Sequence, residues 1–362
     1  MTNDAQHDGL AAVSTHGLSR RRVLALGGTL AGAVALGGLP GTAEATPAPS
    51  GHAGGGAPVN LIIDTDIFSD CDDTGALAIA NAAHDNGKVN LLGVMVDTPS
   101  KWGAPAVDAI NTYYGHGNIP IGTLKPNDDS TFTKNYAQYL AQHFPNSIKS
   151  GTRAPDAVDL YRKILAHQPD HSVTIAAIGL ETNLANLLNS RPDHHSRLSG
   201  MDLVAQKVKL LSVMGGQYPS GREFNFFSDA ASTQRVVNDW PTRAVFDGFE
   251  VGVSVYTGSR LFTQTPSDNP VRKAYEIYVG YGNNRNSWDP SNVFYSIYGA
   301  DQLFTLGGDV GSNHVNPDGS NAYIASPDKD QNYLVKATAD STIARALSDL
   351  MVQPPRQGPN AP

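Results

Sequence analysis

Apolar and polar residues follow one another along the chain in two kinds of block. Short apolar runs of strand length alternate with longer segments of helical spacing, a pattern typical of βαβ units. The runs that predict strands are 59–63, 89–96, 172–178, 207–214 and 243–246. The segments that predict helices are 73–86, 104–115, 155–167, 182–190 and 229–239. We therefore expect an α/β fold with an open, mostly parallel sheet flanked by helices.

The C-terminal part has a different character. Residues 307–333 carry short polar and aromatic stretches around Pro317-Asp318-Gly319, which predicts a small β-hairpin inserted near the C-terminus of this Rossmann-like fold. Residues 338–351 predict a closing amphipathic helix that ends before Pro354-Pro355. Because no repeat or second linker interrupts this region, residues 58–355 are expected to form a single domain.

The N-terminal residues are predicted to lie outside that domain. The sequence Ser19-Arg20-Arg21-Arg22, a short apolar run and Ala43-Glu44-Ala45 together indicate a twin-arginine signal peptide over residues 1–45. Residues 46–57, rich in glycine, proline and alanine, predict a flexible linker. An uncleaved anchor is the alternative, although the apolar run is short and glycine-rich. We expect a secreted, extracytoplasmic protein whose mature form has no membrane segment.

Charge and cysteine content narrow the choice of partners. The net charge is −8 at pH 7, and removing residues 1–45 does not change it, since they contain three acidic and three basic residues. No basic run remains, so binding to nucleic acid or to anionic membranes is not expected. The single cysteine, Cys71, excludes an intramolecular disulfide. Proteins built on such a sheet are often oligomers, so a homo-oligomer stays open, without an interface to assign.

The most informative stretch is an acidic run at the end of the first predicted strand. Five aspartates fall within ten residues, at Asp64, Asp66, Asp70, Asp72 and Asp73. Carboxylates this close cannot all ionise cheaply without a cation among them. Helix capping accounts for one or two aspartates but not for five. The run lies where open α/β sheets bind ligands, and it predicts a buried hard cation, with Ca²⁺ the best fit to oxygen ligands.

Three later segments carry candidate ligands. The predicted strand that ends at Ile178 precedes a glycine, so its main-chain carbonyl could serve as a neutral metal ligand, although an ordinary strand–helix junction looks the same. After the next strand, Glu223 and Asn225 offer acceptor and donor groups on one side of an extended segment, suited to hydroxyl recognition. A surface loop explains them equally well. Trp288 and Asp289 precede a proline, where packing and capping are the plain interpretations.

Taken in this order, the four segments resemble the nucleoside hydrolase family of the inosine–uridine-preferring type, from residue 59 to the C-terminus. The most specific motif is DTDIFSDCDD at 64–73, longer than the family's commonest form and similar to a variant in some bacterial members. The resemblance implies Ca²⁺-dependent hydrolysis of the N-glycosidic bond of a nucleoside, with release of ribose and free base.

The family's pattern also implies a role for each matching residue. The metal ligands would be Asp66, Asp73, the Ile178 carbonyl and Asp289. Asp66 would in addition act as the general base. The ribose would be bound by Asp72, Glu223 and Asn225. Asp70 and Cys71 belong to the longer loop and inherit no role.

One departure from the pattern bears on the substrate. Trp288 stands where many members carry a histidine that protonates the leaving base. The purine-specific branch is similar to this chain in placing a tryptophan there, whose indole stacks on the purine. We therefore expect Trp288 to bind the base and purine nucleosides (inosine, adenosine, guanosine) to be the substrates. Trp102 could be a second stacking partner, and His314 could be a substitute acid.

Two other interpretations stay open. A phosphatase of the haloacid dehalogenase type also begins with a strand followed by two alternate aspartates. That family requires threonine or valine where Phe68 stands, and Gly307-Gly308-Asp309 would have to supply its late acidic motif. The second alternative is a non-catalytic protein that binds nucleosides or sugars and has kept the metal.

Overall fold

The computed structural model describes residues 57–68, 70–131, 133–308, 311–326 and 329–356. The predicted signal peptide and all of the predicted linker except Ala57 lie outside the described residues. From Ala57 onward the described residues form one compact unit. Within that part of the chain, no helix combines the length and the apolar character needed to cross a membrane.

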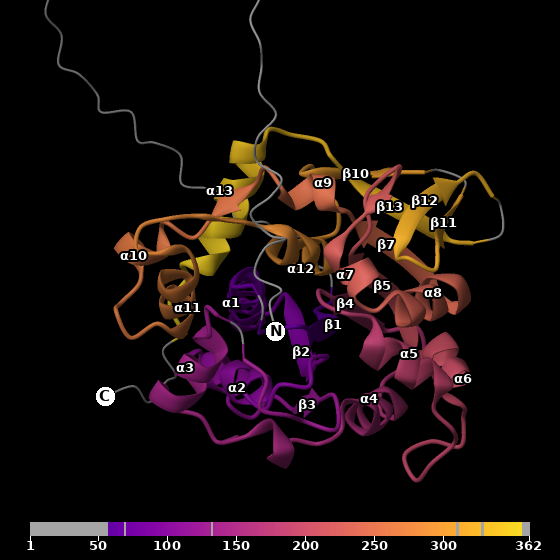
Figure 1. Cartoon of the computed structure of the whole chain (residues 1–362), viewed down its shortest axis with the longest axis horizontal. Coiled ribbons are helices and arrows are strands. Elements are labelled where there is room, and N and C mark those ends of the chain that lie inside the picture. The colour runs from indigo at the N-terminus through magenta and orange to yellow at the C-terminus, as the bar shows by residue number, and fades with distance from the viewer. Residues whose placement is uncertain (1–56, 69, 132, 309–310, 327–328, 357–362) are drawn as a thin grey trace, which may run out of the picture. The chain divides into compact units, whose positions relative to one another are not determined.

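An eight-stranded sheet runs through this unit in the order β10-β13-β7-β5-β4-β1-β2-β3 (Figure 1). Its strands are β1 Val59–Thr65, β2 Val89–Val96, β3 Ile121–Thr123, β4 Val173–Ala177, β5 Val208–Met214, β7 Arg243–Asp247, β10 Phe304–Gly307 and β13 Gln331–Lys336. Each neighbouring pair is parallel except β10 and β13. The predicted α/β fold with a mostly parallel sheet is confirmed, and all five predicted strands belong to it.

The strand order places a crevice beside β1. The chain runs from β1 outward to β2 and β3, then returns to the other side of β1 as β4 and continues to β5 and β7. At such a reversal the connections leave β1 and β4 in opposite directions, which opens a gap at their carboxyl ends. Any ligand site of this sheet is therefore expected where β1 and β4 end.

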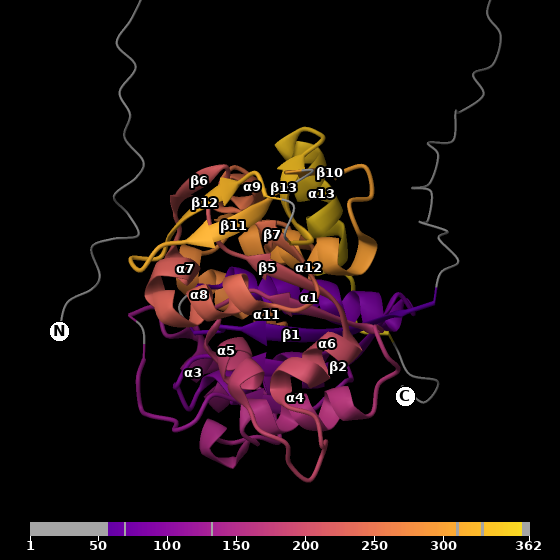
Figure 2. The same cartoon turned by 90° about the vertical axis from the view of Figure 1, so that its right-hand side faces the viewer.

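Helices cover both faces of the sheet (Figures 1 and 2). One hydrophobic cluster joins one face to α1 Asp72–Asp85, α2 Gly103–Tyr113, α3 Tyr136–His143, α11 Pro270–Val279, α12 Trp288–Tyr298 and α13 Asp340–Met351. The other cluster joins the opposite face to α4 Ala157–Ala166, α5 Thr182–Asn189, α6 Gly200–Lys207 and α8 Ala230–Asp239. In β1, Leu61 and Ile63 belong to the first cluster and Ile62 to the second, as the alternation of a strand requires. Burial of both faces explains why the strands appear in the sequence as continuous apolar runs.

The predicted hairpin forms, but it is shorter than expected. The strands β11 Ser312–Val315 and β12 Ser320–Ile324 pair antiparallel on either side of the turn, and β6 Ser220–Arg222 adds a third strand. Residues 331–333, predicted to belong to the hairpin, instead begin β13, which pairs with β7 in the main sheet. Two contacts favour this position: Leu334 is buried in the core, and Gln331 Nε2 donates to the Val237 carbonyl at 2.9 Å.

Short elements complete the unit. They are η1 Gly151–Arg153, α7 Phe224–Ser228, α9 Phe249–Gly252, β8 Tyr256–Thr257, α10 Leu261–Gln264 and β9 Arg285–Asn286. Their place in the fold matters because α7 follows β5 and α9 follows β7 along the chain, and both supply pocket residues described below.

A buried arginine holds the connection between α5 and α6 against α4. Arg162 donates from Nε and Nη2 to the two carboxylate oxygens of Asp193, at 2.7 and 3.1 Å. It also donates to Ser190 Oγ at 2.8 Å and to the carbonyls of Ser196 and Leu198 at 3.1 and 2.9 Å. A buried guanidinium is stable only when its donors are satisfied in this way. The hydrogen bonds from Arg162 hold the pKa of Asp193 well below its usual range.

We predict that Arg162→Met lowers the free energy of unfolding by about 2–4 kcal/mol, because five charge-assisted hydrogen bonds are lost. The Asp193 pKa is lower in the folded than in the unfolded chain, so its contribution is present above about pH 4 and is lost as the pH falls further. Urea unfolding at several pH values should therefore show a shallower acid dependence in the variant. The control is Arg235→Met, which breaks an exposed pair with Asp239 and should change stability by less than about 1 kcal/mol. Equal losses in the two variants would contradict the prediction.

Candidate active site

Segments far apart in the sequence line one pocket at the carboxyl ends of β1, β4 and β5. The lining residues are Asp66, Asp70, Asp72, Ile178, Met214, Glu223, Phe224, Asn225, Phe249, Trp288 and Asp289. Seven of the eight residues singled out in the sequence are among them. The eighth, Asp73, is fully buried beside the pocket.

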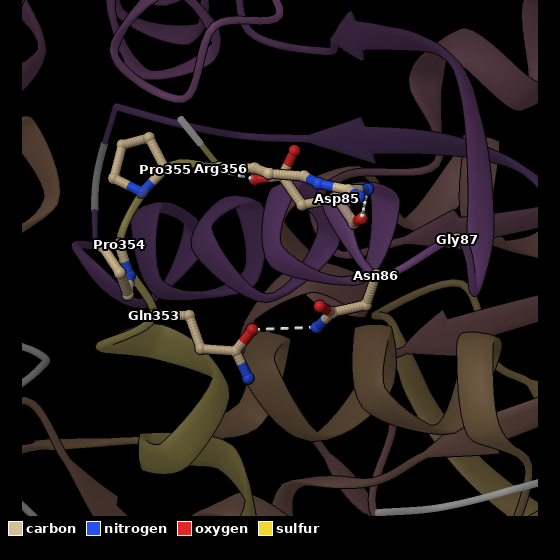
Figure 3. A pocket seen from close by; sticks show the side chains of 7 residues that line it. All are labelled: Asp85, Asn86, Gly87, Gln353, Pro354, Pro355 and Arg356. Carbon is tan, nitrogen blue, oxygen red and sulfur yellow. Dashed lines mark hydrogen bonds between the residues drawn. The ribbon is translucent and has the colours of Figure 1, made fainter. Parts of the chain in front are cut away.

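A second hollow lies at the opposite end of α1 (Figure 3). Residues 85–87 face residues 353–356 there, with Asn86 Nδ2 donating to Gln353 Oε1 at 2.8 Å and Arg356 N donating to Asp85 Oδ2 at 3.1 Å. The turn after α1 leads into the start of β2, so this hollow lies at the amino edge of the sheet. It has a single carboxylate, and we take the pocket at the carboxyl edge as the candidate site.

The two aspartates at the end of β1 have different surroundings. Asp64 is fully buried, and its oxygens accept hydrogen bonds from Tyr161 Oη at 2.8 Å and from Asn183 Nδ2 at 2.9 Å. These bonds tie β1 to α4 and α5, while burial raises the pKa of Asp64 to about 7. Asp66 comes just after the strand and lines the pocket. Of the two, only Asp66 is therefore placed to meet a ligand.

Three carboxylates meet at the N-termini of two helices. Asp72 and Asp73 lie in the first turn of α1 and Asp289 in the first turn of α12, and each offers an oxygen within 4.8 Å of the others. Asp72 Oδ2 accepts the backbone N–H of Trp288 at 3.1 Å and of Asp289 at 3.2 Å, so the two helix ends are docked on one another. Burial raises the pKa of all three carboxyls well above the usual range, and repulsion from neighbouring aspartates raises it further.

The donor set of this cluster fits a divalent cation. Asp73 Oδ1 accepts from Thr65 Oγ1, whereas Asp73 Oδ2 is buried without a hydrogen-bond partner among the described residues. Arg285, which lowers the pKa of Asp72, is itself paired with Asp70. A cation with oxygen ligands would satisfy the unpartnered oxygen and offset the repulsion. Asp66 and Ile178, lining the same pocket, are placed to complete its coordination.

Glu223 and Asn225 lie on the other side of the pocket. Glu223 caps α7, with Oε1 accepting from Asn225 N at 2.8 Å and Oε2 from Gly216 N and Phe226 N at 3.1 and 3.2 Å. The expected extended segment is therefore wrong for Asn225, because the Glu223 cap starts a helix whose first turn contains it. Asn225 Nδ2 donates to the Met214 carbonyl at 3.1 Å. Both side chains still line the pocket, and both are oriented by fixed backbone groups.

Aromatic side chains form the remaining wall. The rings of Phe249 and Trp288 stack with their centres 5.6 Å apart and 29° between their planes. The indole Nε1 donates to the Phe249 carbonyl at 2.8 Å. Gly252 packs so closely on the indole that a Cβ there would collide with Trp288 Cδ1. The indole is thus held in one orientation at the pocket.

Two aromatic or basic candidates from the sequence do not reach this pocket. Trp102 precedes α2 and lies beneath Lys101, whose Nζ is 4.7 Å from the ring centre. His314 is an exposed residue of β11. Neither is among the lining residues, so the structure supports neither the second stacking partner nor the substitute acid. Cys71 is fully buried, and burial raises the pKa of its thiol.

Several residues at the site were missed from the sequence. Asp97 directly follows β2, is fully buried, and has no hydrogen-bond partner for either carboxylate oxygen in the described structure. A Cβ on Gly179 would collide with Asp97 Oδ2 and reach Asp66 N at 2.5 Å, so the Asp97 carboxylate and the Asp66 backbone both pack on Gly179. The position of Asp97 at the end of a strand beside β1 was a usable signal. Met214, Phe224 and Phe249 also line the pocket, and nothing in the sequence around Phe249 marks it.

The family follows from comparison with known proteins. The sequence profile of a family described as inosine-uridine preferring nucleoside hydrolase matches residues 61–283. The chain belongs to this family. The phosphatase interpretation of the DxD motif is therefore wrong. The nucleoside hydrolase match covers all the candidate residues except Trp288 and Asp289, which the structure brings to the same pocket.

Individual relatives and solved structures have low sequence identity to this chain or match only part of it. The pyrimidine-specific ribonucleoside hydrolase RihA of Salmonella newport (strain SL254) is 32% identical over 95 residues, which is 26% of this chain and 28% of that protein. The match thus spans little more than a quarter of that relative. A purine-preferring ribonucleoside hydrolase from Gardnerella vaginalis has a TM-score of 0.62 at 15% identity, covering 81% of this chain and 98% of that one. For the inosine-uridine preferring nucleoside hydrolase from Bacillus anthracis the TM-score is 0.60 at 16% identity, covering 81% and 99%. At these identities the two structures show a shared fold.

We predict opposite effects of Asp289→Asn with and without a divalent cation. With a chelator the melting temperature should equal or exceed that of the unaltered protein, because one of three clustered charges is removed. With Ca²⁺ added, the gain in melting temperature should be smaller than for the unaltered protein, because a ligand has been lost. Thermal unfolding measures both, and Asp349→Asn, at an exposed position, serves as control. An equal gain in all three proteins would contradict a cation site at this cluster.

Proposed function

We propose that this chain hydrolyses the N-glycosidic bond of ribonucleosides with Ca²⁺ as its cofactor, giving ribose and a free base. The observation that carries the proposal is the convergence in one pocket of carboxylates from α1 and α12 with Glu223 and Asn225 of α7. This arrangement offers acidic oxygens on one side and oriented hydroxyl-binding groups on the other. The aromatic wall formed by Trp288 and Phe249 supplies a surface for a base.

The ribose would be held by Asp72, Glu223 and Asn225. Glu223 accepts three backbone N–H groups, so its carboxylate is oriented before a substrate arrives. Oε1 accepts one of these three bonds, from Asn225 N, and can accept a second hydrogen bond, for which a sugar hydroxyl is a suitable donor. Prior orientation lowers the entropic cost of placing the anomeric carbon against the attacking water.

Ca²⁺ would be held by Asp66, Asp73, Asp289 and the Ile178 carbonyl. When bound, the ion supplies Lewis acidity that makes a water molecule a better nucleophile. Asp66, which lines the same pocket, accepts the proton of the attacking water. As the bond from C1′ to the base breaks, positive charge develops on the ribose ring, and the surrounding carboxylates stabilise it. The departing base takes its proton from solvent.

The proposed base is a purine. None of the described residues that line the pocket is a histidine, so stacking takes the place of direct protonation. Trp288 presents a large ring held in one orientation, and a bicyclic purine gains more contact with it than a pyrimidine does. The name of the Salmonella relative specifies pyrimidines and that of the Gardnerella structure purines, so the names of these proteins do not decide between the two. For the place of reaction we propose the outside of the cytoplasmic membrane, on the twin-arginine sequence at Ser19–Arg22.

We predict that Asp66→Asn lowers kcat for inosine by about 10²–10⁴-fold, the usual contribution of a positioned general base. A reducing-sugar assay for free ribose measures this. Asp349→Asn, outside the pocket lining and in an exposed ion pair, should keep full activity. Full activity of the Asp66 variant would contradict the assignment of the base.

We also predict the response to a panel of nucleosides. Inosine, adenosine and guanosine should release ribose faster than uridine and cytidine, because stacking on Trp288 favours the larger ring. A chelator should abolish the reaction and added Ca²⁺ should restore it. Activity on uridine alone would contradict the stacking argument, and activity that resists the chelator would contradict the metal. Binding of inosine without turnover would support the non-catalytic alternative.

A further inference from the structure

We propose that Asp70 and Arg285 form a positioning pair that fixes the indole of Trp288 at the base-binding end of the pocket. Asp70 belongs to the two-residue extension of the acidic loop, to which the family's pattern assigns no role. The inference rests on the proposed function in one respect: it concerns the base that the reaction releases.

The first step is the attachment of the extended loop. Arg285 Nε lies 3.1 Å from Asp70 Oδ1 and 3.0 Å from Oδ2, and Nη2 lies 2.5 Å from Oδ2. This two-pronged geometry fixes both side chains more firmly than a single contact would. On the loop side, Asp70 Oδ1 also accepts from Cys71 N at 2.6 Å, and Tyr136 Oη donates to the Asp70 carbonyl. The loop is therefore anchored from two directions, although the pair itself is about a fifth exposed (21% for Arg285, 20% for Asp70).

The second step leads from Arg285 to the indole. Arg285 lies on β9, three residues before Trp288, and β9 is paired antiparallel with β8. Its guanidinium carbon is 5.3 Å from the centre of the Trp288 ring and 5.4 Å from that of Tyr278. At such distances a guanidinium is attracted to an aromatic ring. The same cation thus binds the loop through Asp70 and the base-binding wall through Trp288.

The third step is the tight packing around the indole. Phe249 stacks on the ring and accepts its N–H, and the backbone at Gly252 packs on its edge. Arg285 adds a contact that depends on the extended loop, because Asp70 orients the guanidinium. Loss of Arg285 should let the indole sample other orientations while the rest of the pocket keeps its structure.

The charge of the pair separates this role from an effect on the metal cluster. Asp70 and Arg285 cancel one another, so removing Arg285 alone leaves an added negative charge near Asp72. The double variant Asp70→Asn/Arg285→Met removes both charges and leaves the balance unchanged. If the pair acts on the indole, the double variant should behave like Arg285→Met, not like the unaltered protein.

The test is a double-mutant cycle measured on kcat/KM. Arg285→Met should lower kcat/KM for inosine by about 10–100-fold, the usual effect of a small misplacement of a substrate-binding group. In a Trp288→Phe background the same change should have little further effect, since the group it positions is gone. Arg285→Lys keeps the positive charge but loses the forked guanidinium geometry. Its kcat/KM should therefore lie between those of the unaltered protein and of Arg285→Met. Arg260→Met breaks another arginine–aspartate pair, with Asp349 on the surface, and should leave kcat/KM unchanged.

A second readout does not depend on activity. Acrylamide quenching of tryptophan fluorescence, compared with the matching Trp288→Phe protein, isolates the exposure of Trp288. Arg285→Met should increase this exposure, and Arg260→Met should not. The inference would be overturned if Arg285→Met lowered kcat/KM equally in the Trp288 protein and in the Trp288→Phe protein, or left the quenching unchanged. Neither result would contradict the proposed function. If the unaltered protein hydrolyses no nucleoside and quenching still responds to Arg285, the proposed function fails and the positioning role stands.

Discussion

The repulsion among Asp72, Asp73 and Asp289 is the constraint on which the rest of the site depends. These carboxylates are buried at the N-termini of α1 and α12, and Asp72 accepts two backbone N–H groups from α12. The helix dipoles and hydrogen bonds offset part of the cost of burying the charges, and a cation would offset more. The rest of the free-energy cost of burying these charges is offset by the apolar core beneath them, where α1 packs on α12 and both cover one face of the sheet. The geometry for chemistry is thus maintained by elements that take no part in it.

The parts of this site that are visible in the sequence are those specified locally. The strands could be predicted because burial on both faces leaves continuous apolar runs, and the acidic run is legible because five aspartates lie within ten residues. Phe249 could not be predicted, since its place at the pocket depends on how α9 packs against Trp288. The same holds for residues 331–333, whose membership in the main sheet depends on a partner strand, β7, that lies about ninety residues earlier. The helical position of Asn225 follows from the side chain of Glu223, a cap visible only when its partners are known.

Membership of the nucleoside hydrolase family accounts for the order of the motifs, but not for the extended loop. In this chain the extension brings Asp70 to an arginine that precedes the last motif by only three residues. The first and last acidic motifs, more than two hundred residues apart, are therefore joined twice: at Asp72 through backbone hydrogen bonds, and at Asp70 through a guanidinium. A longer loop would ordinarily be more mobile, and here one of the two added residues, Asp70, attaches the loop to Arg285.

The hydrogen bond from Trp288 Nε1 to the Phe249 carbonyl has a consequence for discrimination among bases. The indole has one donor, and it is already engaged within the protein, so Trp288 can contribute only its ring face to recognition. A ring face distinguishes ligands by size and polarisability, and it does not read the keto and amino groups that separate one purine from another. Sites that select by hydrogen bonding reject a wrong partner by leaving buried polar groups unpaired, and an aromatic wall applies no such penalty. Trp288 therefore contributes little selectivity among bases of equal size.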